Sequence, residues 1–122
     1  MSFRIPAGWP AEVLAPGQDG WIESATKWLL DLLPGDFRSY EVFRRYPVLL
    51  ARLAFSVIEG NLAATRKAWS AARISEQEFM PPQAIAEAIE QLERVGVNFG
   101  KQGREVKLVL TELERSIRLP GN

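Results

Sequence analysis

Residues that could perform acid–base chemistry in this chain are mainly carboxylates, lysines and tyrosines, because its 122 residues include no histidine and no cysteine. Histidine is the usual proton carrier near neutral pH and the commonest metal ligand, whereas cysteine supplies thiolate nucleophiles and disulfides. Three carboxylates, Glu87, Glu90 and Glu93, share one face of a helix by their spacing. They lie off the apolar positions of that helix, so we expect no metal site, no cofactor and no enzymatic activity.

The densest group of basic and aromatic residues directly precedes Pro47. It consists of Arg38, Tyr40, Arg44, Arg45 and Tyr46. Such a group could hold an anion by charge or a nucleotide base by stacking. We favour the alternative, in which the rings pack the end of a helical bundle while the arginines extend into solvent. If a small-ligand site exists, we expect it where this group meets the N-terminal arm, at Trp21, Trp28, Tyr40, Arg44 and Arg45.

The segment from Gly96 to Gln102 carries glycines and a lysine in the order of a phosphate-binding P-loop, but it does not fit the motif. Three residues instead of four separate its glycines, Gln102 replaces the hydroxyl residue that would hold magnesium, and no strand precedes it. We therefore expect no nucleotide site there.

Residues 84–111 resemble the recognition helix and wing of winged-helix regulators. A helix ending near Val97 is followed by a glycine-rich basic turn and then by the run from Arg104 to Thr111. The resemblance implies that Lys101 and Arg104 would contact the DNA backbone. Glutamates occupy the helix surface that would face the groove, so DNA binding through this segment is an alternative to our main interpretation.

Residues 1–20 are too rich in proline and glycine for regular structure, yet they carry interspersed apolar side chains. We expect an irregular arm that lies on an apolar surface of its own domain, with an arm exchanged in a dimer as the alternative. Residues 21–119 are expected to form a single helical domain, which a chain of this length can stabilise without disulfides.

The pattern after the arm predicts an all-α fold, a long antiparallel helical hairpin plus a shorter N-terminal helix in a bundle-like arrangement. The shorter helix is expected over residues 21–33, with Asp19 as its N-cap. A second helix is expected from 47 to about 73, where apolar residues recur at alternating steps of four and three. After the turn at Pro81-Pro82, the same alternation predicts a third helix over 82–117.

Three glycines, Gly96, Gly100 and Gly103, oppose this last helix, each by about 1 kcal/mol relative to alanine. The competing interpretation is a β-hairpin of residues 97–99 and 104–111. Because the apolar register continues across the glycines, we predict an unbroken helix and leave open whether they kink it.

Charge and hydropathy limit the partners that the sequence suggests. The 15 basic and 15 acidic residues cancel, so no net field attracts nucleic acid or anionic lipid. The N-terminus lacks the basic and apolar regions of a secretion signal, and no apolar run approaches the ~18 residues of a membrane span. We therefore expect a cytoplasmic protein without a membrane partner.

Two segments resemble a group of small uncharacterised actinobacterial helical proteins: Tyr46-Pro47-Val48-Leu49-Leu50-Ala51-Arg52-Leu53-Ala54, and Met80-Pro81-Pro82-Gln83-Ala84-Ile85 downstream. The resemblance covers about the last two thirds of the chain. It implies a bacterial cytoplasmic protein with a helical fold and brings no activity, ligand or site residue with it.

The last helix is expected to be longer than its partner, since roughly 36 residues span about 54 Å and roughly 26 residues about 39 Å. Its C-terminal apolar positions would then lack a cover within the chain. These positions are Val106, Leu110, Leu113 and Ile117. We interpret the protein as a non-enzymatic helical interaction module in which they contact a second copy, in a homodimer, or another helical protein. A small-ligand binder at the arm junction is the second alternative, after DNA binding.

Overall fold

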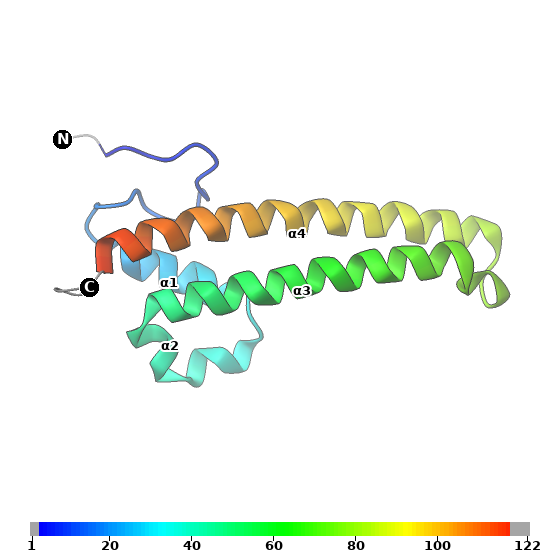
Figure 1. The fold of residues 1–122 in the computed structure, drawn as a ribbon, viewed down its shortest axis with the longest axis horizontal. Helices are drawn as coiled ribbons and strands as arrows, with labels where there is room; N and C mark the ends of the chain where they lie inside the picture. The colour runs from blue at the N-terminus through cyan, green and yellow to red at the C-terminus, as the bar shows by residue number, and fades with distance from the viewer. Residues whose placement is uncertain (1–2, 118–122) are drawn as a thin grey trace. The chain divides into compact units, whose positions relative to one another are not determined.

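The computed structural model describes residues 3–117, and over that range the chain is all-α, with no strand. The α-helices are α1 (Trp21–Asp31), α2 (Glu41–Arg45), α3 (Pro47–Ile74) and α4 (Pro82–Ile117) (Figure 1). Short 3-10 helices, η1 (Gly35–Ser39) and η2 (Glu76–Glu78), precede α2 and α4. The expected all-α class, with a shorter N-terminal helix and a long helix pair, is confirmed.

The chain forms two compact units. One unit comprises the residues up to Val57 together with those from Arg104 onward, and the other comprises Ile58–Gly103. Helices α3 and α4 each contribute to both units, and the N-terminal arm belongs to the first. The expected boundary at residue 20, with a single domain over 21–119, stays a prediction.

Helix α1 begins without the side-chain cap that the sequence suggested. Its N-cap is Gly20 rather than Asp19, no side chain caps the first turn, and Gly20 has a φ of 82°. Glycine adopts this left-handed conformation at little cost, so backbone geometry turns the chain into the helix. Ser24 connects the arm to α1, because its Oγ accepts a hydrogen bond from Leu14 N (3.0 Å) and donates one to Trp21 O (2.7 Å).

The N-terminal arm packs on helices of its own unit. Trp9 Nε1 donates a hydrogen bond to Val13 O at 3.0 Å, and the rings of Trp9 and Trp21 lie 6.1 Å apart between centroids. A Cβ added to Gly8 would lie 3.5 Å from Leu108 Cδ1, so the arm backbone runs close to α4. The interspersed apolar residues of the arm are thus used within the chain.

The C-terminal part of α4 is covered inside the first unit, which contradicts the expectation of an uncovered apolar end. Val106 and Leu113 are fully buried, and Leu110 and Ile117 are half-buried. The prediction that these four positions lack a cover within the chain is therefore wrong.

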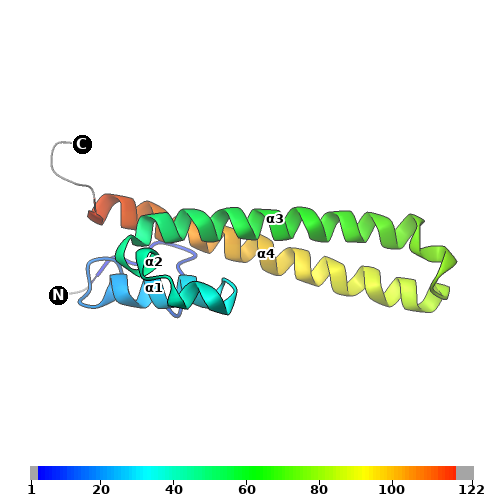
Figure 2. The same cartoon turned by 90° about the horizontal axis from the view of Figure 1, so that it is seen from below.

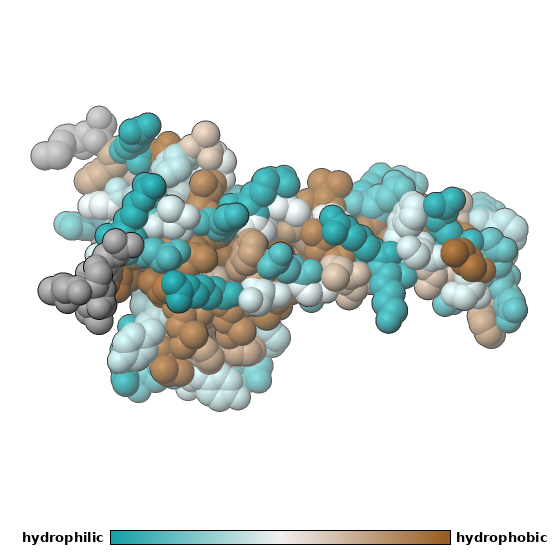
Figure 3. Space-filling view, in the orientation of Figure 1, coloured by the Kyte–Doolittle hydropathy of each residue, from teal (hydrophilic) through white to brown (hydrophobic). Residues whose placement is uncertain are grey.

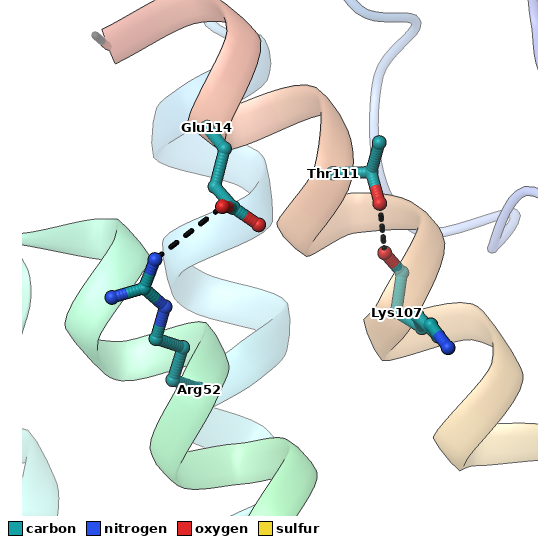
Figure 4. Close-up of polar contacts among 4 residues, drawn as sticks. All are labelled: Arg52, Lys107, Thr111 and Glu114. Carbon is teal, nitrogen blue, oxygen red and sulfur yellow. Dashed lines mark hydrogen bonds and ion pairs between the residues drawn. The ribbon is translucent and has the colours of Figure 1, made fainter. Parts of the chain in front are cut away.

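The cover comes from three parts of the same unit. The start of α3 reaches the last turns of α4, because Arg52 Nη2 lies 3.3 Å from Glu114 Oε2 (Figure 4). Helix α1 and the arm lie beside the same part of α4 in both ribbon views (Figures 1 and 2). Helix lengths alone do not reveal this cover, because α1 and the arm lie beside α4 in addition to α3.

The second unit is an antiparallel pair made by the end of α3 and the first part of α4. A Cβ added to Gly103 would lie 3.7 Å from Ile58 Cγ2, and one added to Gly96 would lie 3.9 Å from Leu62 Cδ1. From the first pair to the second, the residue number rises on α3 and falls on α4, so the two helices are antiparallel. Small residues on α4 thus face branched side chains on α3.

Helix α4 continues as one α-helix through its three glycines, as the apolar register predicts. None of the three has a positive φ, and Gly96 and Gly103 face α3. The β-hairpin alternative is wrong, because every residue that it would use is helical. Residues 84–111 consequently have no wing, and the winged-helix alternative lacks the strands that would place Lys101 and Arg104 against DNA.

Candidate functional site

The basic and aromatic group before Pro47 forms η1 and α2, and its rings pack on one another. Ring centroids lie 5.4 Å apart for Phe37 and Phe43, and 6.2 Å apart for Tyr40 and Phe43. Tyr40 meets Phe37 edge-on at 5.8 Å. Tyr40 and Tyr46 nevertheless remain 47% and 54% exposed, so this cluster is only partly covered by the rest of the chain.

The five residues expected at a ligand junction do not converge. Trp21 and Trp28 are buried in the core of the first unit, 5% and 8% exposed. Tyr40 belongs to the ring cluster, and Arg45 pairs with a glutamate of its own helix. Of the five, Arg44 lines a pocket. A ligand site at these five residues stays a prediction, and the pocket places Arg44 beside residues of α1 and η1 rather than beside the two tryptophans.

The pocket that Arg44 lines has a volume of about 440 Å³ and lies in the first unit between α1, η1 and α2. Its lining includes Ile22, Thr26, Leu30, Lys27, Arg38 and Arg44. The first three share one face of α1, since they are four residues apart. Helix spacing could have indicated this row, but only the fold shows that two arginines from later elements face it.

The cations at this pocket differ in their partners. Arg38 Nη2 bonds Asp31 Oδ1, which fixes the arginine across the end of α1. The side chains of Lys27 and Arg44 make no hydrogen bond or ion pair within the described residues. Glu23 is a carboxylate at the same pocket. Three basic groups and one acidic group therefore surround an apolar floor made by Ile22 and Leu30.

A second feature of the first unit is a row of exposed apolar side chains at the junction of α2 and α3. This group, called the apolar row, consists of Val42, Tyr46 and Leu49. Their exposed fractions are 44%, 54% and 46%. The hydrogen bond from Tyr46 N to Val42 O (3.0 Å) places these two on successive turns of the chain. Apolar residues gather over α2 and the start of α3 in the space-filling view (Figure 3).

Two arginines near the apolar row, Arg45 and Arg52, are paired. Arg45 Nη2 lies 3.5 Å from Glu41 Oε2 along α2, and Arg52 pairs with Glu114. Sequence reasoning missed this surface because it assigned Tyr46 to bundle packing and searched for uncovered apolar residues on α4. The exposed fractions of Val42, Tyr46 and Leu49 show instead that a group of exposed apolar side chains lies at the junction of α2 and α3.

The second unit is weakly buried. Ile58 and Ala72 are its buried residues, while Ile74, Phe79 and Val97 are 77%, 78% and 70% exposed. These three lie at the turn or singly along α4, and scattered exposed apolar residues are common on soluble proteins. We therefore build no site on them.

Two of the three glutamates expected to share a face of α4, Glu90 and Glu93, make surface contacts. Glu90 Oε1 pairs with Arg94 Nη2 at 2.8 Å, and Glu93 Oε1 accepts a hydrogen bond from Trp69 Nε1 at 3.3 Å. Within residues 3–117 no group of three acidic side chains is arranged to hold a metal ion. These carboxylates act as partners for neighbouring side chains.

Helix α3 meets the length and composition of a membrane-crossing helix, and among the described helices it alone does so. Only 22% of its most apolar stretch is buried. Core helices of soluble proteins can meet the same criterion, so this is weak evidence for a membrane span. Of its large apolar side chains, Leu49 and Ile74 are exposed.

Comparison of this chain with protein-family models, curated proteins and solved structures finds no match. The functional proposals below therefore depend on the geometry of the chain itself.

Proposed function

We propose that this protein is a non-enzymatic helical interaction module of the cytoplasm that forms a homodimer through the apolar row. The observation that carries the proposal is the exposure of Val42, Tyr46 and Leu49, each close to half. Contact between large apolar side chains and water is unfavourable in free energy, and association removes that contact. Exposed apolar patches therefore mark interaction sites.

The composition of the row favours a protein partner. Tyrosine is enriched in the energetically dominant centres of protein interfaces, because it buries a large apolar ring while its hydroxyl keeps a hydrogen bond. Tyr46 lies between Val42 and Leu49, so an aromatic residue occupies the centre of the row with aliphatic neighbours. This arrangement is typical of an anchor residue within a surrounding apolar rim.

Charge complementarity favours a second copy as that partner. Glu41 and Arg45 lie one turn apart on α2, next to the row. A two-fold axis through α2 would place Glu41 of one chain opposite Arg45 of the other, so the same surface supplies both signs of charge. With 15 basic and 15 acidic residues, two copies also experience no net repulsion.

The size of the row predicts a weak dimer. At roughly 150–250 Å² of surface for a large side chain, three half-exposed residues present on the order of 300 Å² per copy. Even with a polar rim, the interface would total about 1,000 Å², the lower end for specific complexes. We therefore expect dissociation on dilution.

Light scattering after size exclusion, over a range of protein concentrations, tests this proposal. We expect a mass near twice the 13.7 kDa of the chain at several hundred micromolar protein, falling toward one chain on dilution. Leu49→Glu should abolish the dimer, and it should not disturb folding, because glutamate is favoured in the first turn of a helix.

Val97→Glu is the matched control, since it also places glutamate at an exposed aliphatic position of a helix, but away from the row. The control should dimerise like the unmodified chain. A monomer at every concentration would refute self-association, and a dimer that survives Leu49→Glu would show that the apolar row is not its interface.

A further inference from the structure

We propose that the pocket between α1, η1 and α2 binds a small aliphatic carboxylate, with Arg44 as the residue that holds the carboxylate group. This site is independent of self-association and needs neither a metal nor a catalytic group. Its volume of about 440 Å³ lies within the range of small-molecule sites, roughly 300–1,000 Å³.

The apolar floor of the pocket determines which kind of apolar group the ligand can carry. Ile22, Thr26 and Leu30 form one row along α1, and Thr26 Oγ1 already donates a hydrogen bond to Ile22 O at 2.9 Å. Its hydroxyl proton is therefore engaged, and the methyl group of Thr26 extends the apolar floor between Ile22 and Leu30. No aromatic side chain lines this pocket, so the floor suits an aliphatic chain rather than a stacked ring.

The charges around the floor set the polar part of the ligand. Lys27, Arg38 and Arg44 come from three different elements and line one pocket together with the carboxylate of Glu23, while Asp31 pairs with Arg38. This excess of positive charge favours an anion. The ion pair with Asp31 holds Arg38 in place. Within residues 3–117 the guanidinium of Arg44 has no hydrogen-bond or ion-pair partner, so its donors are free for a ligand.

Arginine is the side chain best suited to this role. Its planar guanidinium offers parallel N–H donors that match the two oxygens of a carboxylate, and such paired, charge-assisted bonds are stronger than neutral ones. Lys27 also lines the pocket and adds a second positive charge that has no ion-pair partner among the described residues. A carboxylate above Leu30 would thus meet Arg44 and Lys27 together.

Titration of ¹⁵N-labelled protein with octanoate, followed by NMR, tests the site. We expect shifts confined to the amides of α1 around Thr26 and to the side-chain Nε–H of Arg44, with a Kd on the order of 0.1–1 mM for a ligand of this size. The alcohol 1-octanol has the same chain without the charge and should bind at least tenfold more weakly.

Arg44→Gln should weaken octanoate binding by about tenfold or more, because it removes the charge-assisted donors. Arg66→Gln is the control, an exposed arginine of α3 that does not line the pocket and belongs to neither proposed site. It should leave octanoate affinity unchanged. The absence of octanoate shifts at α1, equal binding of octanol, or an equal loss in both variants would each overturn the proposal.

Discussion

Trp69 Nε1 on α3 donates a hydrogen bond of 3.3 Å to Glu93 Oε1 on α4. The guanidinium carbon of Arg73 lies 4.8 Å from the centre of the same indole ring, one turn further along α3. A tryptophan thereby links an acidic residue of one helix to a basic residue of the other. This contact defines which sides of the two helices adjoin in the second unit.

Trp69 should contribute to stability through its ring far more than through its hydrogen bond. Glu93→Ala should lower the free energy of unfolding by less than about 0.5 kcal/mol, because the bond is exposed. Trp69→Ala should lower it by about 2–3 kcal/mol through lost apolar contact in a weakly buried unit. Urea denaturation followed by circular dichroism measures both, and equal effects of the two substitutions would contradict the prediction.

Gly103→Ala should stabilise the protein by about 0.5–1 kcal/mol. The added Cβ would lie 3.7 Å from Ile58 Cγ2, an ordinary contact, and alanine is the better helix former. Gly8→Ala, where φ is 82°, should destabilise by about 1 kcal/mol or more. Thermal unfolding distinguishes the two signs. A lower melting temperature for Gly103→Ala would show that the helices require glycine there.

Leu113→Ala should cost about 3 kcal/mol of stability, because the side chain is fully buried and its removal leaves a cavity. Leu49→Ala, at a position that is 46% exposed, should cost less than about 1 kcal/mol. Chemical denaturation under dilute, monomeric conditions measures both values. If Leu113→Ala left stability unchanged but dissociated a dimer, Leu113 would lie at an interface after all.

The candidate sites show where sequence patterns stop being informative. Helix spacing places Ile22, Thr26 and Leu30 on one face of a helix. The sequence does not indicate that Arg38 and Arg44 line the same pocket as these residues. The short elements η1 and α2 decide that placement. Their direction depends on packing among Phe37, Tyr40 and Phe43, which lies beyond helix periodicity.

By itself the sequence determined the class and extent of the helices. Apolar residues at alternating steps of four and three predict α3 and α4, and the uninterrupted register across Gly96 and Gly103 correctly outweighed the low helix propensity of glycine. Periodicity succeeds here because it records which side of a helix meets apolar surroundings.

Only the tertiary structure decided which apolar residues are covered. Periodicity identifies an apolar face but not the element that packs against it. It therefore predicted exposed side chains at Val106 and Leu113, which are buried, and did not predict the exposure of Val42 and Leu49. The arm and α1 cover the C-terminal part of α4, whereas Val42 and Leu49 stay 44% and 46% exposed on a segment whose other face, with Leu50 and Ala51, is buried. Burial depends on contacts between segments distant in the chain, and a local pattern contains no information about those contacts.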